Sequence, residues 1–301
     1  MVRVDPAFER VARRLSVVEL RAEDASVPAT SEGTPGGTVN GRFDPFAADS
    51  GLFVDFYTPA GLRRAITRYG LHEKLVEQGL GDWELVVTRE DAFRHRMEVV
   101  INGGTTRVMD LRLHLSRVAM PGAEESVDVV FVDWLLMQNP RRSFSVDRPR
   151  LPGQQHPGTG LGRAVHNLLL ILCRRIQREA LLSVPEYWHL ARIYQSGGYV
   201  PLSPSLARDM DDITRAGEKA GLSLCLTAWA VERGCVVLPD GAAYSWHPSE
   251  LLAPVSSRLE AGVRSGGFLH QPSLARRTLR LDVEALRKSL ADQPVEGVQL
   301  D

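Results

Sequence analysis

The chain has 301 residues and a formal net charge of −1, from 36 basic and 37 acidic side chains. This balance excludes the strong overall field that draws a protein to nucleic acid or to an anionic membrane surface. A hydrophobic content of 44% is typical of a soluble globular protein, and no apolar run approaches the roughly 20 residues needed to span a bilayer. We therefore expect neither nucleic acid nor a membrane among its partners.

The N-terminal segment, residues 1–21, is interrupted by charges and lacks the apolar stretch of a signal peptide, which predicts a short amphipathic helix. The three cysteines, Cys173, Cys225 and Cys235, lie among apolar neighbours. No CxxC pair or Cys/His cluster has the spacing of metal ligands. We expect a cytoplasmic protein with buried free thiols and no metal site.

A linker is expected over residues 22–57, which are mostly Gly, Pro, Ser, Thr, Ala and Asp up to residue 52. A Thr-Pro start at Thr58 then predicts a helix that runs on to Leu75 and Val76. Two candidate strands follow, at residues 83–88 and 96–101, and Asn102 opens a tight hairpin turn.

The return strand, TTRVMDLRLHL, alternates apolar and polar side chains, so its leucines face inward while Arg112 and His114 face outward. The next strand, VDVVFVDWLLM, is apolar almost throughout and is therefore predicted to be central in the sheet. Later predicted elements are a helix over 162–178, a strand near 180–184, a helix from Pro185, a helix over 206–219, a strand or buried helix in SLCLTAWAV, a hairpin turning at 239–241, and helices near 255–263 and 283–290.

The stretch QQHPGTGLG, residues 154–162, places glycine at every second position directly before an apolar helix. Glycine tolerates positive φ, so such a loop can turn several N–H groups toward one point. The first helical turn adds unpaired N–H groups and the positive end of the helix dipole. Together these features predict an anion site, most often for phosphate or pyrophosphate; a loop that merely turns the chain is the alternative.

Two segments in this context, GTGLGRAVHNLLL and YWHLARIYQSGGYVPL, resemble the GCN5-related N-acetyltransferases (GNAT). The first is similar to the pyrophosphate loop of that family, usually written Q/R-x-x-G-x-G/A, and the second to its later helix that ends in Tyr, Gly and an aromatic residue. The element order over residues 58–202 is also that of the family. The resemblance implies an α+β fold whose mixed, mostly antiparallel sheet is flanked by helices, with residues 203–301 as a C-terminal helix and hairpin extension.

Two registers of the loop motif fit the chain. Gln155, Gly158 and Gly160 satisfy the pattern literally, whereas matching the helix start puts Gly160 and Gly162 on the glycine positions and Pro157 on the polar one. We favour the second register, because GLGRAV then opens the helix. The residues that the resemblance implies for binding acetyl-CoA as co-substrate are Gln155, Gly158, Thr159, Gly160, Leu161, Gly162 and Arg163.

The activity that the resemblance implies is attack of an acceptor amine on the thioester of acetyl-CoA in a ternary complex. A carboxylate removes the proton of the amine, and a backbone N–H at a bulge in the central strand stabilises the oxyanion while a hydroxyl protonates the thiolate. Asp133, with Asp128 and Glu98 behind it, is the expected base, and Tyr194 is the expected acid. An ion-paired surface Asp133 and a core Tyr194 are the structural alternatives.

The acceptor, a small-molecule or protein amine, is not specified by the sequence, and neither is the oligomeric state, a homodimer included. Nineteen residues, NPRRSFSVDRPRLPGQQHP, separate the central strand from the glycines, where the family has a short turn. Their four arginines could meet the 3′-phosphate of coenzyme A or an acidic acceptor, or could remain solvated. Two other functions stay open: a catalytically degenerate GNAT-like module for ligand binding or scaffolding, and transfer of a longer acyl group.

Overall fold

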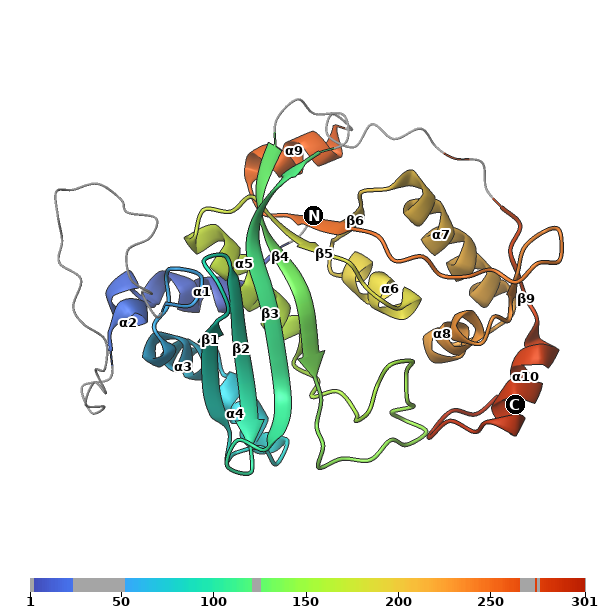
Figure 1. Ribbon diagram of the computed structural model, residues 1–301, viewed down its shortest axis with the longest axis horizontal. Coiled ribbons are helices and arrows are strands. Elements are labelled where there is room, and N and C mark those ends of the chain that lie inside the picture. The colour runs from blue at the N-terminus through green and yellow to red at the C-terminus, as the bar shows by residue number, and fades with distance from the viewer. Residues whose placement is uncertain (1–2, 24–51, 121–125, 266–273, 275–276, 301) are drawn as a thin grey trace.

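The computed structural model describes residues 3–23, 52–120, 126–265, 274 and 277–300, so most of the predicted linker lies outside the described residues. The described chain is mixed α+β, as predicted, with a seven-stranded, mostly antiparallel sheet flanked by helices (Figure 1). None of the described helices combines the length and the apolarity needed to cross a bilayer. Cys173, Cys225 and Cys235 are buried and unbridged.

The sheet has the order β1-β2-β3-β4-β5-β8-β6, and all neighbours are antiparallel except β4 and β5, which are parallel. The predicted hairpin after β2 is confirmed, because Asn102, Gly103 and Gly104 all have positive φ. The strands are β1 (Glu84–Arg89), β2 (Arg94–Ile101), β3 (Thr106–Ala119), β4 (Ser126–Met137), β5 (Ala180–Ser183), β6 (Val200–Pro201) and β8 (Leu251–Pro254).

Two predicted helices are each divided in the structure. The N-terminal helix is α1 (Pro6–Arg14) followed by α2 (Val17–Arg21), because Ser16 starts a new helix through a capping box with Glu19. The helix predicted from Thr58 is α3 (Pro59–Arg68) and α4 (Leu71–Glu77), separated at Gly70, whose φ of 74° is left-handed.

The C-terminal region is more deeply joined to the sheet than the prediction of an extension from residue 203 implied, because β8 lies between β5 and β6. All four residues of β8 are buried, yet four apolar residues carry no periodic signal that would distinguish a strand. The segment SLCLTAWAV is a helix rather than a strand. The remaining elements are α5 (Gly162–Arg175), α6 (Trp188–Ser196), α7 (Pro204–Lys219), α8 (Leu224–Glu232), β7 (Val236–Val237), α9 (Ser257–Arg264), β9 (Arg280–Leu281) and α10 (Val283–Asp292).

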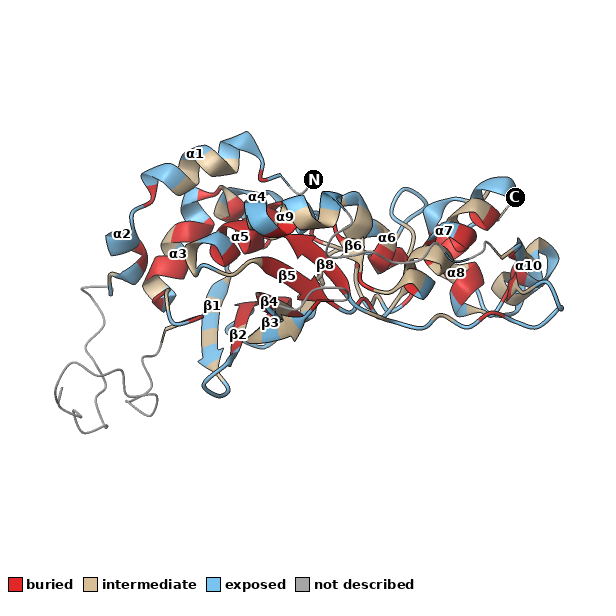
Figure 2. Ribbon diagram, turned by 90° about the horizontal axis from the view of Figure 1, so that it is seen from above, coloured by how far each residue is buried: buried red, intermediate tan, exposed pale blue. Residues whose placement is uncertain are grey.

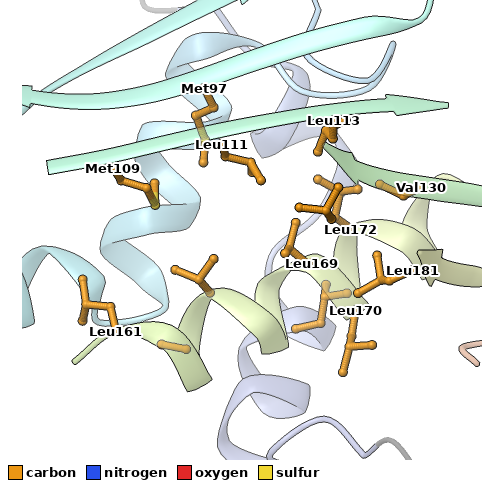
Figure 3. Close-up of a cluster of buried hydrophobic side chains, with 14 of the residues drawn as sticks. Met97, Met109, Leu111, Leu113, Val130, Leu161, Leu169, Leu170, Leu172 and Leu181 are labelled. Carbon is orange, nitrogen blue, oxygen red and sulfur yellow. The ribbon is translucent and has the colours of Figure 1, made fainter. Parts of the chain in front are cut away.

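The main core lies between one face of the sheet and the helices α1, α3, α4 and α5 (Figure 2). Leu111 and Leu113 of β3 point toward Leu169 and Leu172 of α5, at the centre of this layer (Figure 3). In Figure 2 no described helix lies against the opposite face of β1, β2 and β3. That face is available for polar side chains and for a ligand, and the candidate site extends onto it.

Candidate functional site

The parallel pairing of β4 with β5 stops partway along β4. Its last register pair is Val132 with Ser183, whereas β4 continues to Met137 in contact with β3. Over residues 133–137, the edge of β4 that faces away from β3 therefore has no strand partner in the described chain. Backbone N–H and C=O groups on such an edge can pair with an extended ligand.

A β-bulge lies at the first residue of this unpaired segment. Leu113 of β3 pairs with Val132, but the preceding Arg112 pairs with Trp134, so Asp133 has no partner on β3. Because of the extra residue, Asp133 and Trp134 both lie on the face opposite the main core, and Leu135 then returns to that core. The bulge that the resemblance implied for oxyanion binding is thus present, and its unpaired residue is Asp133.

The predicted base, Asp133, is bound to a histidine. Nδ1 of His114 on β3 lies 2.8 Å from Oδ2 and 3.0 Å from Oδ1 of Asp133. The imidazole stacks on Phe131, with ring centroids 4.8 Å apart and planes inclined by 16°. Sequence reasoning placed His114 on the outward face but gave it no functional role, because its partner depends on a register that the bulge sets.

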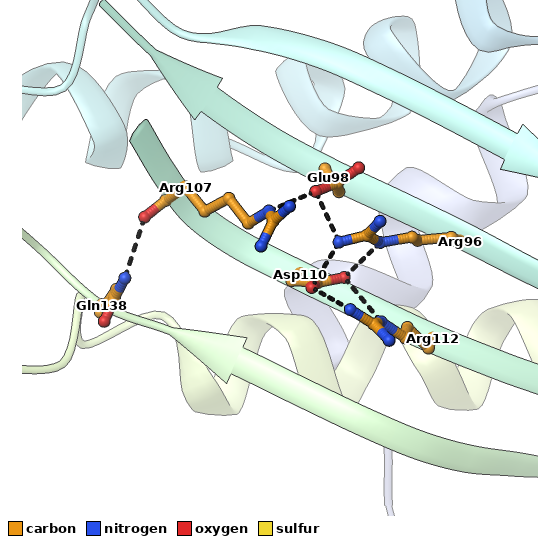
Figure 4. A network of polar contacts seen from close by, with 6 residues as sticks. All are labelled: Arg96, Glu98, Arg107, Asp110, Arg112 and Gln138. Atoms are coloured by element: carbon orange, nitrogen blue, oxygen red, sulfur yellow. Dashed lines mark hydrogen bonds and ion pairs between the residues drawn. The ribbon is translucent and has the colours of Figure 1, made fainter. Parts of the chain in front are cut away.

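The other two carboxylates considered as bases are held by arginines. Asp128 accepts from Nε of Arg117 at 3.0 Å, and this hydrogen bond holds the pKa of Asp128 below its usual range. Glu98 lies 2.6 Å from Nε of Arg107 and 2.8 Å from Nη2 of Arg96 (Figure 4). Both carboxylates are therefore structural ion-pair partners.

The same face of β2 and β3 carries a second buried carboxylate, Asp110. Arg96 donates to both oxygens of Asp110 at 2.9 and 2.8 Å, and Arg112 adds contacts at 3.5 and 3.1 Å (Figure 4). Burial raises the pKa of Asp110, but the hydrogen bonds from the two arginines outweigh it and leave the pKa below its usual range. These ion pairs cover the sheet face beside His114 in place of a helix.

The glycine loop, residues 154–162, lies beside the end of β4 and leads into α5. The N–H of Asn139, just beyond β4, donates to the carbonyl of Pro157 at 2.7 Å. Gly160 has a φ of 74°, so only glycine takes this position without strain. The N–H of Leu161 donates to Oγ1 of Thr159 at 3.3 Å.

The remaining amides of the loop are open. The N–H groups of Gly160, Gly162 and Arg163 have no acceptor among the described residues, and all three residues are exposed. α5 begins at Gly162, so its N-terminal dipole adds to these amides. Gln155 is exposed and makes no hydrogen bond within the described chain, so the choice between the two registers of the motif stays a prediction.

Tyr194, the predicted acid, lies on α6, which begins at Trp188 rather than at Pro185. Its ring stacks on Tyr199 at a centroid distance of 5.2 Å, and the nearby side chain of Ser183 lowers the pKa of Tyr194. Oγ of Ser183 in turn lies 3.4 Å from the carbonyl oxygen of Val132. Burial raises the pKa of Tyr194, so the phenol stays protonated at neutral pH.

Tyr194 and Asp133 therefore lie near the same point along the β4–β5 pairing, but on opposite faces of the sheet. Tyr194 packs against the main core, whereas Asp133 lies on the opposite face, one residue beyond the Val132–Ser183 pair. The bulge directly follows this end of the parallel pairing, whereas the glycine loop contacts the end of β4, at Met137 and Asn139.

Two arginines of the long segment before the glycines have structural partners. Arg141 donates to Asp82 at 2.8 Å and to the side chain of Asn102 at 3.0 Å, which ties this segment to the β2–β3 hairpin. Nε of Arg150 donates to the carbonyl of Gln154 at 2.7 Å. Neither arginine has a hydrogen bond to Gly160, Gly162 or Arg163 among the described residues.

Comparison with protein-family models and with curated proteins finds no match for this chain. Its function must therefore be inferred from the arrangement of its own residues. These are an unpaired strand edge, a bulge that carries a histidine–carboxylate pair, a partly buried phenol and a glycine loop with open amides.

Proposed function

We propose that this chain is an acyl-CoA-dependent N-acyltransferase with a GNAT-like fold, which moves an acetyl group from acetyl-CoA to an amine by direct attack in a ternary complex. The observation that carries the proposal is the end of the β4–β5 pairing at Val132, directly before the bulge at Asp133. A thioester with an extended, amide-containing arm fits an unpaired strand edge that leads to a glycine loop.

The glycine loop would hold the pyrophosphate of acetyl-CoA. Open amides of Gly160, Gly162 and Arg163 at a helix N-terminus form a site for a doubly charged anion, and the exposed guanidinium of Arg163 adds a positive charge. The free edge of β4 over residues 133–137 would pair with the amides of the pantetheine arm. This directs the thioester toward the bulge.

The reacting groups then have separate roles. A backbone N–H at the bulge would stabilise the oxyanion of the tetrahedral intermediate. The pair of Asp133 and His114 would take the proton of the acceptor amine. Tyr194, which burial keeps protonated, would give a proton to the departing thiolate.

A second function, a ligand-binding module without catalysis, is favoured by one observation. Pro157 occupies the polar position of the favoured loop register, it is buried, and its carbonyl is bound to Asn139. No side chain from that position can therefore reach a pyrophosphate. This alternative predicts cofactor binding without turnover.

Acetyl-CoA is expected to raise the melting temperature of the purified chain by about 5 °C at 100 times the Kd, and by a further amount that grows with the logarithm of its concentration. Thiol release from acetyl-CoA is then measured with a panel of primary amines, with 3′-dephospho-coenzyme A and inorganic pyrophosphate as binding controls. Binding with transfer to an amine supports the enzyme. Binding without transfer supports the module, and no stabilisation at millimolar acetyl-CoA contradicts both.

Tyr194→Phe is expected to lower kcat about 100-fold while the Kd of acetyl-CoA stays unchanged, because only the proton donor is removed. The matched control is Tyr199→Phe, which deletes the hydroxyl of the ring that stacks on Tyr194. Steady-state kinetics and calorimetric titration measure the two constants. Equal losses of kcat in both variants would show that Tyr194 acts only through packing.

A further inference from the structure

The imidazole of His114 is held in one tautomer by its contacts. Both carboxylate oxygens of Asp133 face Nδ1, at 2.8 and 3.0 Å. In a neutral imidazole only one nitrogen carries a proton, and the nitrogen beside a carboxylate is the one protonated. In the neutral form Nε2 of His114 therefore carries a lone pair, and it has no hydrogen-bond partner among the described residues.

The position of this lone pair is fixed and accessible. His114 and Asp133 belong to adjacent strands, β3 and β4, and the ring is supported by Phe131 beneath it. The side chain of His114 is 27% exposed, so a ligand on the open sheet face can reach Nε2. Groups built on strands in this way are held more precisely than groups on loops.

The surroundings of His114 distinguish it from the ion pairs along the same face. Arg94, its register partner on β2, is bound to Asp91, and Arg112 on its own strand is bound to Asp110. Trp134, which the bulge turns to this face, is 46% exposed. The imidazole of His114 is suited to the amine of an acceptor, and the ring of Trp134 is suited to the carbon atoms attached to that amine.

We propose that His114 is the catalytic base of the transfer and that Asp133 is its positioning residue, which rests on the proposed function. Because Asp133 directs both oxygens to Nδ1, its part is to orient the imidazole and to stabilise the imidazolium. The acceptor is a primary amine that arrives as an ammonium ion over the open face of β3 and β4. Nε2 receives its proton.

The protons and electron pairs of the step balance. The ammonium group gives one proton to Nε2 of His114 and becomes a neutral amine, whose lone pair forms the C–N bond to the acetyl carbon. The electron pair of the C–S bond leaves with sulfur. Nitrogen loses a second proton, sulfur gains one from Tyr194, and the phenol is restored by that second proton. His114 returns its own proton to solvent, so one proton is released per turnover.

The test compares two acceptors that differ in their need for a base. A primary alkylamine is charged at pH 7 and must be deprotonated, whereas hydroxylamine is largely neutral. His114→Asn keeps a donor for Asp133 but removes Nε2, so the rate with the fastest alkylamine is expected to fall about 100-fold while the rate with hydroxylamine is unchanged. His247→Asn, at an exposed histidine, is the control and leaves both rates unchanged.

Asp133→Asn tests the positioning role through a spectrum as well as a rate. Long-range ¹H–¹⁵N spectra of histidine-labelled protein are expected to show the Nδ1–H tautomer for His114 in the wild type, and the Nε2–H tautomer in Asp133→Asn. The variant also loses rate selectively with the alkylamine. A wild-type Nε2–H tautomer, or losses in His114→Asn that are equal for both acceptors or absent, would overturn the proposal while acetyl-CoA binding stands. Failure of the wild type to bind acetyl-CoA would instead overturn the proposed function and the base assignment with it.

Discussion

Gly160→Leu is expected to abolish measurable acetyl-CoA binding at micromolar concentrations while the chain remains folded. A Cβ at Gly160 meets no protein atom within 4 Å, so the new side chain occupies open space at the loop that carries the open amides. Losing two hydrogen bonds to a charged group, at about 1.5 kcal/mol each, corresponds to a Kd about 100-fold weaker. Calorimetric titration with acetyl-CoA measures the loss.

A substitution at a second glycine with a similar backbone conformation distinguishes the effect of backbone strain from the exclusion of the ligand. Gly221, which follows α7, has a φ of 69° against 74° for Gly160, and its Cβ also meets nothing within 4 Å. Gly221→Leu therefore has the same left-handed strain of about 1–2 kcal/mol without a ligand nearby. Both variants should melt at similarly lowered temperatures, and only Gly160→Leu should lose acetyl-CoA. Wild-type affinity in Gly160→Leu would contradict the pyrophosphate site.

The features that the sequence could predict depend on neighbouring residues. The glycine loop, the start of α5 and the hairpin after β2 each follow from a few consecutive residues with defined backbone requirements. The division of the predicted Thr58 helix depends on one left-handed glycine, Gly70, in a segment whose apolar pattern continues across it. Local sequence patterns therefore predicted which helices and turns form better than they predicted the residues at which the helices begin and end.

The features that the sequence could not predict depend on pairing between distant segments. β8 is four residues long and joins the sheet some 70 positions after β5, which local periodicity cannot show. The partnership of His114 with Asp133 follows from a one-residue shift of register at the bulge, and such a shift changes which side chains share a face. The same applies to Tyr194, whose nearness to Ser183 depends on how α6 packs.

Gly61→Ala is expected to destabilise the chain by about 3 kcal/mol, because overpacking against backbone atoms cannot be relieved by a rotamer change. A Cβ at Gly61 would lie 1.9 Å from the carbonyl oxygen of Leu20 and 2.5 Å from its carbonyl carbon. The start of α3 and the end of α2 are also joined here, since the N–H of Thr58 donates to Leu20 at 3.2 Å. Urea unfolding measures the loss.

The matched control is Gly81→Ala, whose Cβ would lie 3.4 Å from the side chain and 4.0 Å from the Cα of Val76, both ordinary contacts, and whose cost should stay below about 1 kcal/mol. The segments in which Gly61→Ala accelerates hydrogen exchange show whether the strain is local or global. Arg175 of α5 donates to the carbonyls of Ala12 and Leu15, so displacement of α2 would also loosen this support of α5. Faster hydrogen exchange confined to α1, α2 and the C-terminal half of α5 is therefore expected. Since the glycine loop is fixed at the other end of α5 by its bond to the end of β4, acetyl-CoA affinity should be retained, and its loss would show that the N-terminal helices help to form the site.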